Sequence, residues 1–175
     1  ICVGRDGRLS GKTLLEAMCK SLSESGIAVI NIGLVTSPIL YYAAKKNKSK
    51  SGVMITGSHN PKNDNGIKMV INDKPVSGTE ILSLTKYVKN INNKAQIIND
   101  TSVIDQYISE VTHKIKLHNP NRLKVVIDCG NGAAGAVAPE LFKKLGCDVI
   151  NLFSEVDGNF PNHHPDPGKL DNLKD

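Results

Sequence analysis

The chain has 175 residues, of which 39% are hydrophobic and 4% aromatic, and its formal net charge is +5. This length and apolar content suffice for one large domain or two small ones, and no apolar run approaches the roughly eighteen residues that a membrane-spanning helix requires. Because the positive charge is scattered lysine, with only three arginines and few rings for base stacking, the composition also argues against a nucleic-acid-binding protein.

Strand and helix signals alternate along the first half of the chain, which indicates an α/β arrangement. Ser10 is expected to cap a helix whose apolar residues follow helical spacing, and Gly26 is expected to end it. Pro38 is expected to open a second, short helix. Apolar runs bounded by turn residues predict strands at 1–3, 27–32, 52–55 and 67–71.

The middle of the chain has helical periodicity over 78–91 and again over 105–117. The Asn-rich stretch between these helices, 90–100, is expected to be a loop. We place a domain boundary near residue 104, which divides the chain into domains 1–104 and 105–175.

A second strand–helix–strand unit is expected to begin near Leu123. Its strands are predicted at 125–127 and 147–153, with Gly146 ending the helix between them. The following segment, 157–168, contains prolines, glycines and two histidines, and is expected to be an ordered loop or linker rather than a helix.

The four cysteines have no C-x-x-C spacing, and no signal peptide opens the chain. Buried, reduced thiols in a cytoplasmic protein explain them better than disulfides or zinc ligands. They are Cys2, Cys19, Cys129 and Cys147.

The stretch TGSHNPKNDNGIKMV, residues 56–70, contains the most chemistry. Ser58 follows an expected strand, and Gly57 before it lets the backbone bend so that the hydroxyl stands clear of the strand end. The dipeptide Asn65-Gly66 favours a turn, after which the chain returns as a strand. If the two strands pair, the Lys68 ammonium lies near the Ser58 hydroxyl.

Two interpretations of this loop remain open on residue types alone. Serine becomes a nucleophile when a base or a positive field activates it, and a phosphorylated serine needs cations close by. Alternatively, the serine caps a turn and the lysine protects an edge strand. Residue types by themselves favour the second, structural interpretation.

The serine loop resembles the phosphoserine loop of the α-D-phosphohexomutases, in the bacterial phosphomannomutase/phosphoglucomutase branch. Four other segments resemble that family in its order and spacing: VGRDGRLSG at 3–11, GLVTSPILYYAA at 33–44, VVIDCGNGAAG at 125–135 and EVDGNFPNHHPDPGKLDNLKD at 155–175. The resemblance implies a first domain with a mixed sheet and flanking helices, followed by the start of a similar second domain. In the family a strand and a helix precede this point and most of the protein follows it, so we expect a fragment.

The resemblance also implies a function for the whole protein, the interconversion of hexose 1-phosphate and hexose 6-phosphate with glucose and mannose as sugars. Phosphorylated Ser58 would pass its phosphoryl group through a bound hexose 1,6-bisphosphate. Lys68 would act as general acid/base, His59 would orient the transferring groups, and Arg5 and Arg8 would contribute positive field. Mg²⁺ would bind the Ser58 phosphate and aspartates of an Asp-Gly-Asp-x-Asp loop that this chain lacks. We therefore expect a monomer that binds hexose phosphates, with glucose 1,6-bisphosphate as activator, and a fragment that is inactive alone.

A different function is suggested by the glycine turn Gly130, Gly132 and Gly135. Its G-x-G-x-x-G pattern follows an expected strand and precedes a helix, as in oxidoreductases that bind NAD. Against this alternative, Asp128 would place negative charge near the pyrophosphate. A tight turn that needs small residues accounts for the same glycines, and we favour that explanation.

The adjacent histidines His163 and His164 offer metal-ligand chemistry. Neighbouring histidines cannot easily face one ion, and no further ligand spacing supports zinc. We expect them to have a positioning role in the loop between the two domains.

Overall fold

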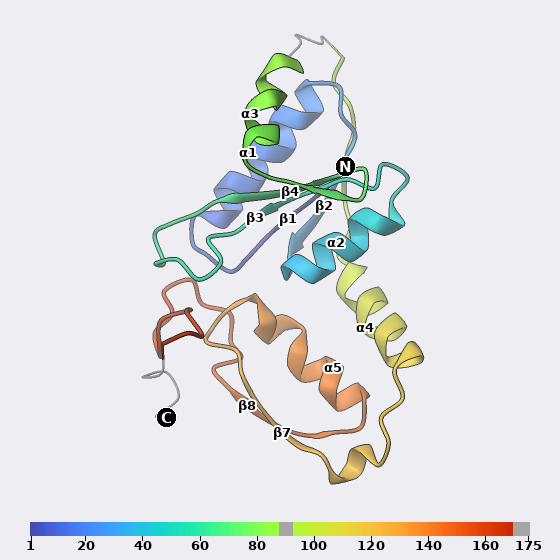
Figure 1. The fold of residues 1–175 in the computed structure, drawn as a ribbon, viewed down its shortest axis with the longest axis vertical. Helices are drawn as coiled ribbons and strands as arrows, with labels where there is room; N and C mark the ends of the chain where they lie inside the picture. Colours follow the sequence, from blue (N-terminus) through green and yellow to red (C-terminus); the bar gives the residue numbers. More distant parts are fainter. Residues whose placement is uncertain (88–92, 170–175) are drawn as a thin grey trace.

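The computed structural model of the protein describes residues 1–87 and 93–169 (Figure 1). Among these residues, six strands form one sheet in the order β5-β4-β3-β1-β2-β6. β1, β2, β3 and β6 run parallel, whereas β4 and β5 are antiparallel additions at one edge, so the predicted mixed sheet is confirmed. The strands are β1 Cys2–Arg5, β2 Val29–Leu34, β3 Gly52–Ile55, β4 Ile67–Ile71, β5 Lys74–Val76 and β6 Ile97–Asn99.

Helices cover both faces of this sheet, as Figure 1 shows for α1 and α2. The reason is the period-two alternation of the strands, which sends successive side chains to opposite faces. In β3, Met54 belongs to one apolar cluster, while its neighbours Val53 and Ile55 belong to the other. The helices are α1 Gly11–Glu24, α2 Ser37–Lys46, α3 Thr79–Ser83 and α4 Val103–Lys114, with a 3-10 turn at Leu84–Tyr87.

The ends of α1 show one correct and one incorrect prediction. Gly26 ends the helix in a left-handed conformation with φ 76°, and the Ile27 amide donates to the Leu22 carbonyl at 2.9 Å, which is a Schellman ending. Ser10 stands at the expected N-terminal position but does not cap it. Its Oγ instead accepts a hydrogen bond from Asn65 Nδ2 at 2.8 Å.

Two strands lie where none was predicted. β6 falls inside the stretch expected to be a loop, because three residues suffice for pairing along the edge of β2. β5 pairs with β4 through a tight turn at Asn72 and Asp73, whose φ values are 49° and 64°, as such hairpins require. The helix predicted over 78–91 is shorter, because α3 ends at Ser83 and a 3-10 turn follows; residues 88–91 lie outside the described residues.

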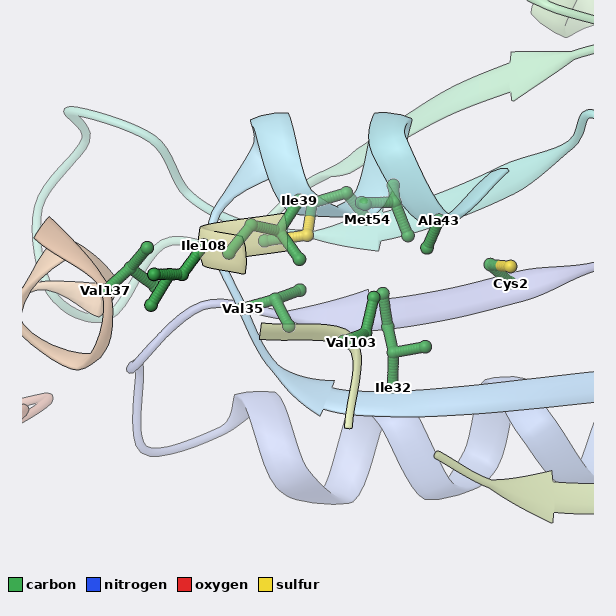
Figure 2. Packing of buried hydrophobic residues seen from close by; sticks show 10 residues of the cluster. Cys2, Ile32, Val35, Ile39, Ala43, Met54, Val103, Ile108 and Val137 are labelled. Carbon is green, nitrogen blue, oxygen red and sulfur yellow. The ribbon is translucent and has the colours of Figure 1, made fainter. Parts of the chain in front are cut away.

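The second unit contains the parallel pair β7 and β8 with α5 between them in sequence. Its elements are 3-10 turns at Pro120–Arg122 and Ala133–Ala136, β7 Lys124–Asp128, α5 Ala138–Lys144 and β8 Asp148–Leu152. Helix α4 connects the two units (Figure 1), and Figure 2 shows Val103 and Ile108 of α4 and Val137 of the second unit in the cluster that α2 also joins. The predicted boundary near residue 104 stays a prediction.

Two expectations from composition can be compared with the fold. All four cysteines are buried and unbridged, as predicted. Among the described residues, no helix has the length and apolar character to span a membrane.

Candidate active site

The serine loop connects β3 to β4, and the two strands pair as predicted, with Ile55 opposite Ile67. The Thr56 amide donates to the Gly66 carbonyl at 2.9 Å and closes the base of the loop. Ser58 is exposed beyond the strand end and has a left-handed backbone with φ 54°. A residue with a side chain keeps this costly conformation only where its surroundings impose it.

Asp6, at the end of β1, fixes the first turn of the loop. Its Oδ2 accepts hydrogen bonds from Thr56 Oγ1 at 2.8 Å and from the Gly57 amide at 3.2 Å. Because the Thr56 hydroxyl gives its one proton to Asp6, its oxygen is available to accept the Ser58 amide at 2.9 Å. These hydrogen bonds fix the amide side of the left-handed residue Ser58.

Arg8 binds the rest of the loop from inside. The residue is 1% exposed, and its guanidinium donates to four backbone carbonyls of the loop. Nη2 donates to Ser58 at 2.9 Å and to Asn60 at 2.8 Å, while Nη1 donates to Pro61 and, at 2.9 Å, to Asp64. A guanidinium matches such a ring of acceptors because its donors are fixed in one plane.

The fifth donor of Arg8, Nε, binds Asp6 Oδ2 at 3.2 Å. Each of the five N–H groups of the guanidinium therefore has an acceptor. Arg8 can give a phosphate on Ser58 a favourable field, but a direct hydrogen bond to it would break one of these contacts. The structure thus places Arg8 first of all as the residue that shapes the loop.

Gly57 is required for a reason other than the expected one. The left-handed residue is Ser58, and Gly57 is not among the glycines with positive φ. A Cβ at position 57 would lie 2.3 Å from Arg8 Cζ and 2.4 Å from its Nε. The missing side chain lets the guanidinium pack against the backbone next to the serine.

Lys68 and Arg5 are less closely connected to the serine. Lys68 is exposed on β4 and pairs with Met54, four residues before Ser58. Within the described part of the chain, no hydrogen bond joins its ammonium to the Ser58 hydroxyl. Arg5 is half-buried and donates from Nη1 to the Asp6 carbonyl at 2.8 Å. The roles expected for both residues stay predictions.

His59 lies beside a cleft of about 520 Å³ between the serine loop and the second unit. The opposite wall contains Asp128, at the end of β7, and His163. His163 Nε2 lies 2.9 Å from Asp128 Oδ2, and its Nδ1 lies 3.0 Å from the His164 carbonyl. Each ring nitrogen therefore lies within hydrogen-bonding distance of an oxygen, which fixes the orientation of the imidazole.

The glycine turn of the second unit is explained by close packing. A Cβ on Gly135 would lie 1.9 Å from the Ser154 carbonyl oxygen, and one on Gly130, whose φ is 50°, would lie 2.8 Å from His163 Cε1. Asp128 accepts the Gly130 amide at 2.8 Å. These contacts account for the small residues, as the structural explanation of the turn requires.

The described residues do not form a magnesium site by themselves. In residues 1–87 and 93–169, no three His, Cys, Asp or Glu side chains are grouped so that they could hold a metal ion. Near Ser58, the Asp6 carboxylate is already occupied by the Thr56 hydroxyl, the Gly57 amide and Arg8. A phosphate on Ser58 would add one ligand here, but the described residues supply no cluster of carboxylates to complete the site.

Comparison with known proteins gives two matches to family models. Residues 1–95 match the phosphoglucomutase/phosphomannomutase α/β/α domain I, and residues 105–175 match domain II of the same family. Nothing in these comparisons supports the alternative of an NAD-binding oxidoreductase.

Individual relatives agree with the family models. Phosphomannomutase/phosphoglucomutase of Pseudomonas syringae is 50% identical over 177 residues, and phosphoglucomutase of Neisseria gonorrhoeae is 45% identical over 179. Each alignment covers the whole of this chain and 38% of the relative. A crystal structure of a family protein from Burkholderia thailandensis superposes with a TM-score of 0.92 at 40% identity, covering 99% of this chain and 40% of that one.

Proposed function

The chain belongs to the phosphoglucomutase/phosphomannomutase family, and from this premise we propose that the whole protein interconverts hexose 1-phosphates and hexose 6-phosphates, with glucose and mannose as the sugars. The observation that carries the proposal is the presentation of Ser58. Its hydroxyl is exposed beyond a strand end, and a buried arginine and an aspartate fix the backbone on which it stands.

The proposed reaction transfers one phosphoryl group at a time. The bond between Ser58 Oγ and phosphorus breaks while the free hydroxyl oxygen of the hexose phosphate bonds to that phosphorus, and the hydroxyl proton passes through a base to the departing Oγ. The resulting hexose 1,6-bisphosphate turns in the site. Ser58 then accepts the other phosphoryl group, its own proton passes to the sugar oxygen that is released, and the phosphoserine is restored.

The residues of this chain contribute mainly position and charge, on which phosphoryl transfer depends most. A rigid loop holds Oγ in one place between the two transfers. We assign the proton transfers to Lys68, orientation of the transferring groups to His59, and positive charge near the phosphate to Arg5 and Arg8. Mg²⁺, which neutralises charge on phosphate oxygens when bound, is part of the proposal, with further ligands from outside the residues described here.

We propose a monomeric, cytoplasmic protein with glucose 1,6-bisphosphate as activator, divided near residue 104. We also propose that residues 1–175 alone have no mutase activity, because the described residues contain no cluster of carboxylates that could hold the metal ion together with the phosphate.

The proposal is tested by the phosphorylation state of Ser58. Full-length protein incubated with glucose 1,6-bisphosphate should gain one phosphoryl group, which intact-mass measurement detects and peptide sequencing by mass spectrometry assigns to Ser58. Ser58→Ala should lose both the added mass and mutase turnover. The matched control is Ser21→Ala on the exposed side of α1, which should keep both. Turnover retained in Ser58→Ala would refute the assignment.

A further inference from the structure

A loop of the second unit, residues 155–160, covers the buried arginine that holds the serine loop. The Phe160 ring lies against the Arg8 guanidinium, with 5.6 Å between the ring centroid and Arg8 Cζ. Two glycines bring the backbones together. A Cβ on Gly158 would lie 2.6 Å from the Leu9 amide nitrogen, and one on Gly7 would lie 2.5 Å from the Val156 side chain.

The covering loop is fixed to the second unit by Asn131 of the glycine turn. This residue is 4% exposed. Its Nδ2 donates to the Glu155 carbonyl at 2.9 Å, and its own carbonyl accepts the Asp157 amide at 3.0 Å. Its Oδ1 accepts a hydrogen bond from Asn162 Nδ2 at 2.7 Å. The loop is therefore held on both sides of Phe160.

The in-plane N–H groups of the Arg8 guanidinium bind Asp6 and the serine loop, so only the two faces of the planar group remain for other contacts. Its five N–H groups lie in its plane and bind Asp6 and the loop carbonyls. A Cβ on Gly57 would lie 2.3 to 2.7 Å from Arg8 Cζ, Nε and Nη1. The Gly57 backbone therefore packs against one face of the guanidinium. An aromatic ring stabilises such a desolvated cation and keeps out water that would compete for the carbonyls.

We propose that Phe160 is a positioning residue, through which the second unit fixes the backbone of the Ser58 loop by covering Arg8. The contacts run from Asn131 to the 155–160 loop, then from Phe160 to Arg8, and from Arg8 to the Ser58 and Asn60 carbonyls. The catalytic consequence rests on the proposed mutase function, whereas the ordering of the loop does not.

Hydrogen exchange measured by mass spectrometry on the full-length protein tests the ordering. Peptides spanning 57–64 contain the Asn60 and Asp64 amides, which donate to the Gly57 and Pro61 carbonyls. Phe160→Ala should speed exchange in these peptides by about tenfold, the scale of a cation–π contact withdrawn from water. Peptides from α1 should be unchanged.

Two variants distinguish the effect of the aromatic face of Phe160 from the effect of its apolar volume. Phe160→Tyr keeps the aromatic face and should restore wild-type exchange, while Phe160→Leu keeps apolar volume and should resemble Phe160→Ala. The matched control is Phe153→Ala, because Phe153 contacts His163 edge to face at a centroid distance of 5.5 Å and has no such contact with Arg8. It should leave peptides 57–64 as in the wild type.

The outcomes are distinct. Wild-type exchange at 57–64 in both Phe160→Ala and Phe160→Leu would overturn the proposal, and so would equal acceleration in Phe153→Ala. If Phe160→Ala does not fold, Phe160→Leu decides. In the mutase assay, Phe160→Ala should lower kcat about tenfold or more at nearly constant KM, since misplacement of a reacting atom affects turnover. If Ser58 carries no phosphate, the mutase proposal fails while the exchange result stands.

Discussion

The turns that follow β1 and β7 begin with the same hydrogen bond, and the aspartate of each turn also binds a different nitrogen-bearing side chain. Asp6 follows β1 and accepts the Arg8 amide two residues later at 3.1 Å, while Asp128 ends β7 and accepts the Gly130 amide at 2.8 Å. Asp6 then binds the Arg8 guanidinium, and Asp128 binds the His163 imidazole. Through Arg8, the Asp6 turn also holds the loop between β3 and β4, in which Ser58 has a left-handed backbone.

The serine loop and the glycine turn are held rigid by different interactions. The serine loop projects beyond the sheet, so its carbonyls need a buried donor with many N–H groups, and Arg8 supplies it. The glycine turn lies against its own unit, and close backbone approach at Gly135 holds it. The serine loop is therefore stabilised mainly by the buried Arg8 guanidinium, whereas the glycine turn is stabilised mainly by close backbone packing at Gly135.

Of the substitutions that compare the two loops, removal of Arg8 should cause the largest loss in the free energy of unfolding. Arg8→Met removes the guanidinium from the Asp6 carboxylate and from four loop carbonyls, and loss of one partner from a buried ionic network costs about 3 to 5 kcal/mol. Arg8→Lys should rescue little, because an ammonium cannot span the same acceptors. Denaturant unfolding of full-length protein measures the loss. Arg122→Met, at an exposed position, is the control and should change stability little.

The paired aspartates offer a direct comparison under one substitution. Asp6→Asn should cost about 2 to 3 kcal/mol, because its carboxylate accepts from Arg8, Thr56 and Gly57, and hydrogen bonds to charged groups are the stronger ones. Asp128→Asn should cost about 1 kcal/mol, since its side chain is 33% exposed and exposure weakens an ion pair. Equal losses in thermal or denaturant unfolding would mean that the two loops are held alike.

Packing rather than charge should decide the stability of the glycine turn. Gly135→Ala would bring a methyl group against the Ser154 carbonyl, and such overpacking costs about 1 to 3 kcal/mol. Hydrogen exchange should rise around residues 130–154 and stay unchanged at 57–64. Acceleration in the serine loop instead would contradict the separate origins of rigidity in the two loops.

The smallest effect is expected at the α2–α4 joint, which is on neither loop. Glu110 accepts from Lys114 at 2.6 Å, Lys46 at 2.7 Å and the Tyr42 hydroxyl at 2.9 Å, and these contacts lower the pKa of its carboxyl to about 2. A depressed folded-state pKa gives stability that is present above the unfolded value, near 4.5, and is lost as the pH falls toward about 2.

Thermal melts of wild type and Glu110→Gln test this joint. The wild type should be the more stable by a small margin at pH 6, and the margin should shrink as the pH drops below about 4.5 toward 2. A margin that stays constant over this range would mean that the carboxylate charge contributes nothing.

Sequence reasoning worked where the signal was local. The strands on both sides of Ser58 are apolar runs bounded by turn residues, and both were predicted with the observed bounds. β6 was missed because a three-residue edge strand has too short a pattern, and pairing with β2 decides its conformation.

The geometry of the serine loop was predicted in part for the same reason, while the roles of its residues stay predictions. The position of Ser58 at a strand end follows from its neighbours, but Arg8 was expected to supply only field, since the carbonyls it binds lie about fifty residues later. Asp128 and His163 are 35 residues apart, so no local sequence pattern indicates that their side chains meet. Asp6 next to Arg8 was the available signal for a structural role.

The left-handed backbone at Ser58 also restricts which amino acid can carry the hydroxyl. Threonine offers the same oxygen, but its branched β-carbon crowds the backbone at positive φ, where bulky and branched side chains are true outliers. Serine is therefore the alcohol that this position admits, and the choice is made by stereochemistry before reactivity enters. Ser58→Thr would keep the hydroxyl group but would disfavour the left-handed backbone on which that hydroxyl is presented.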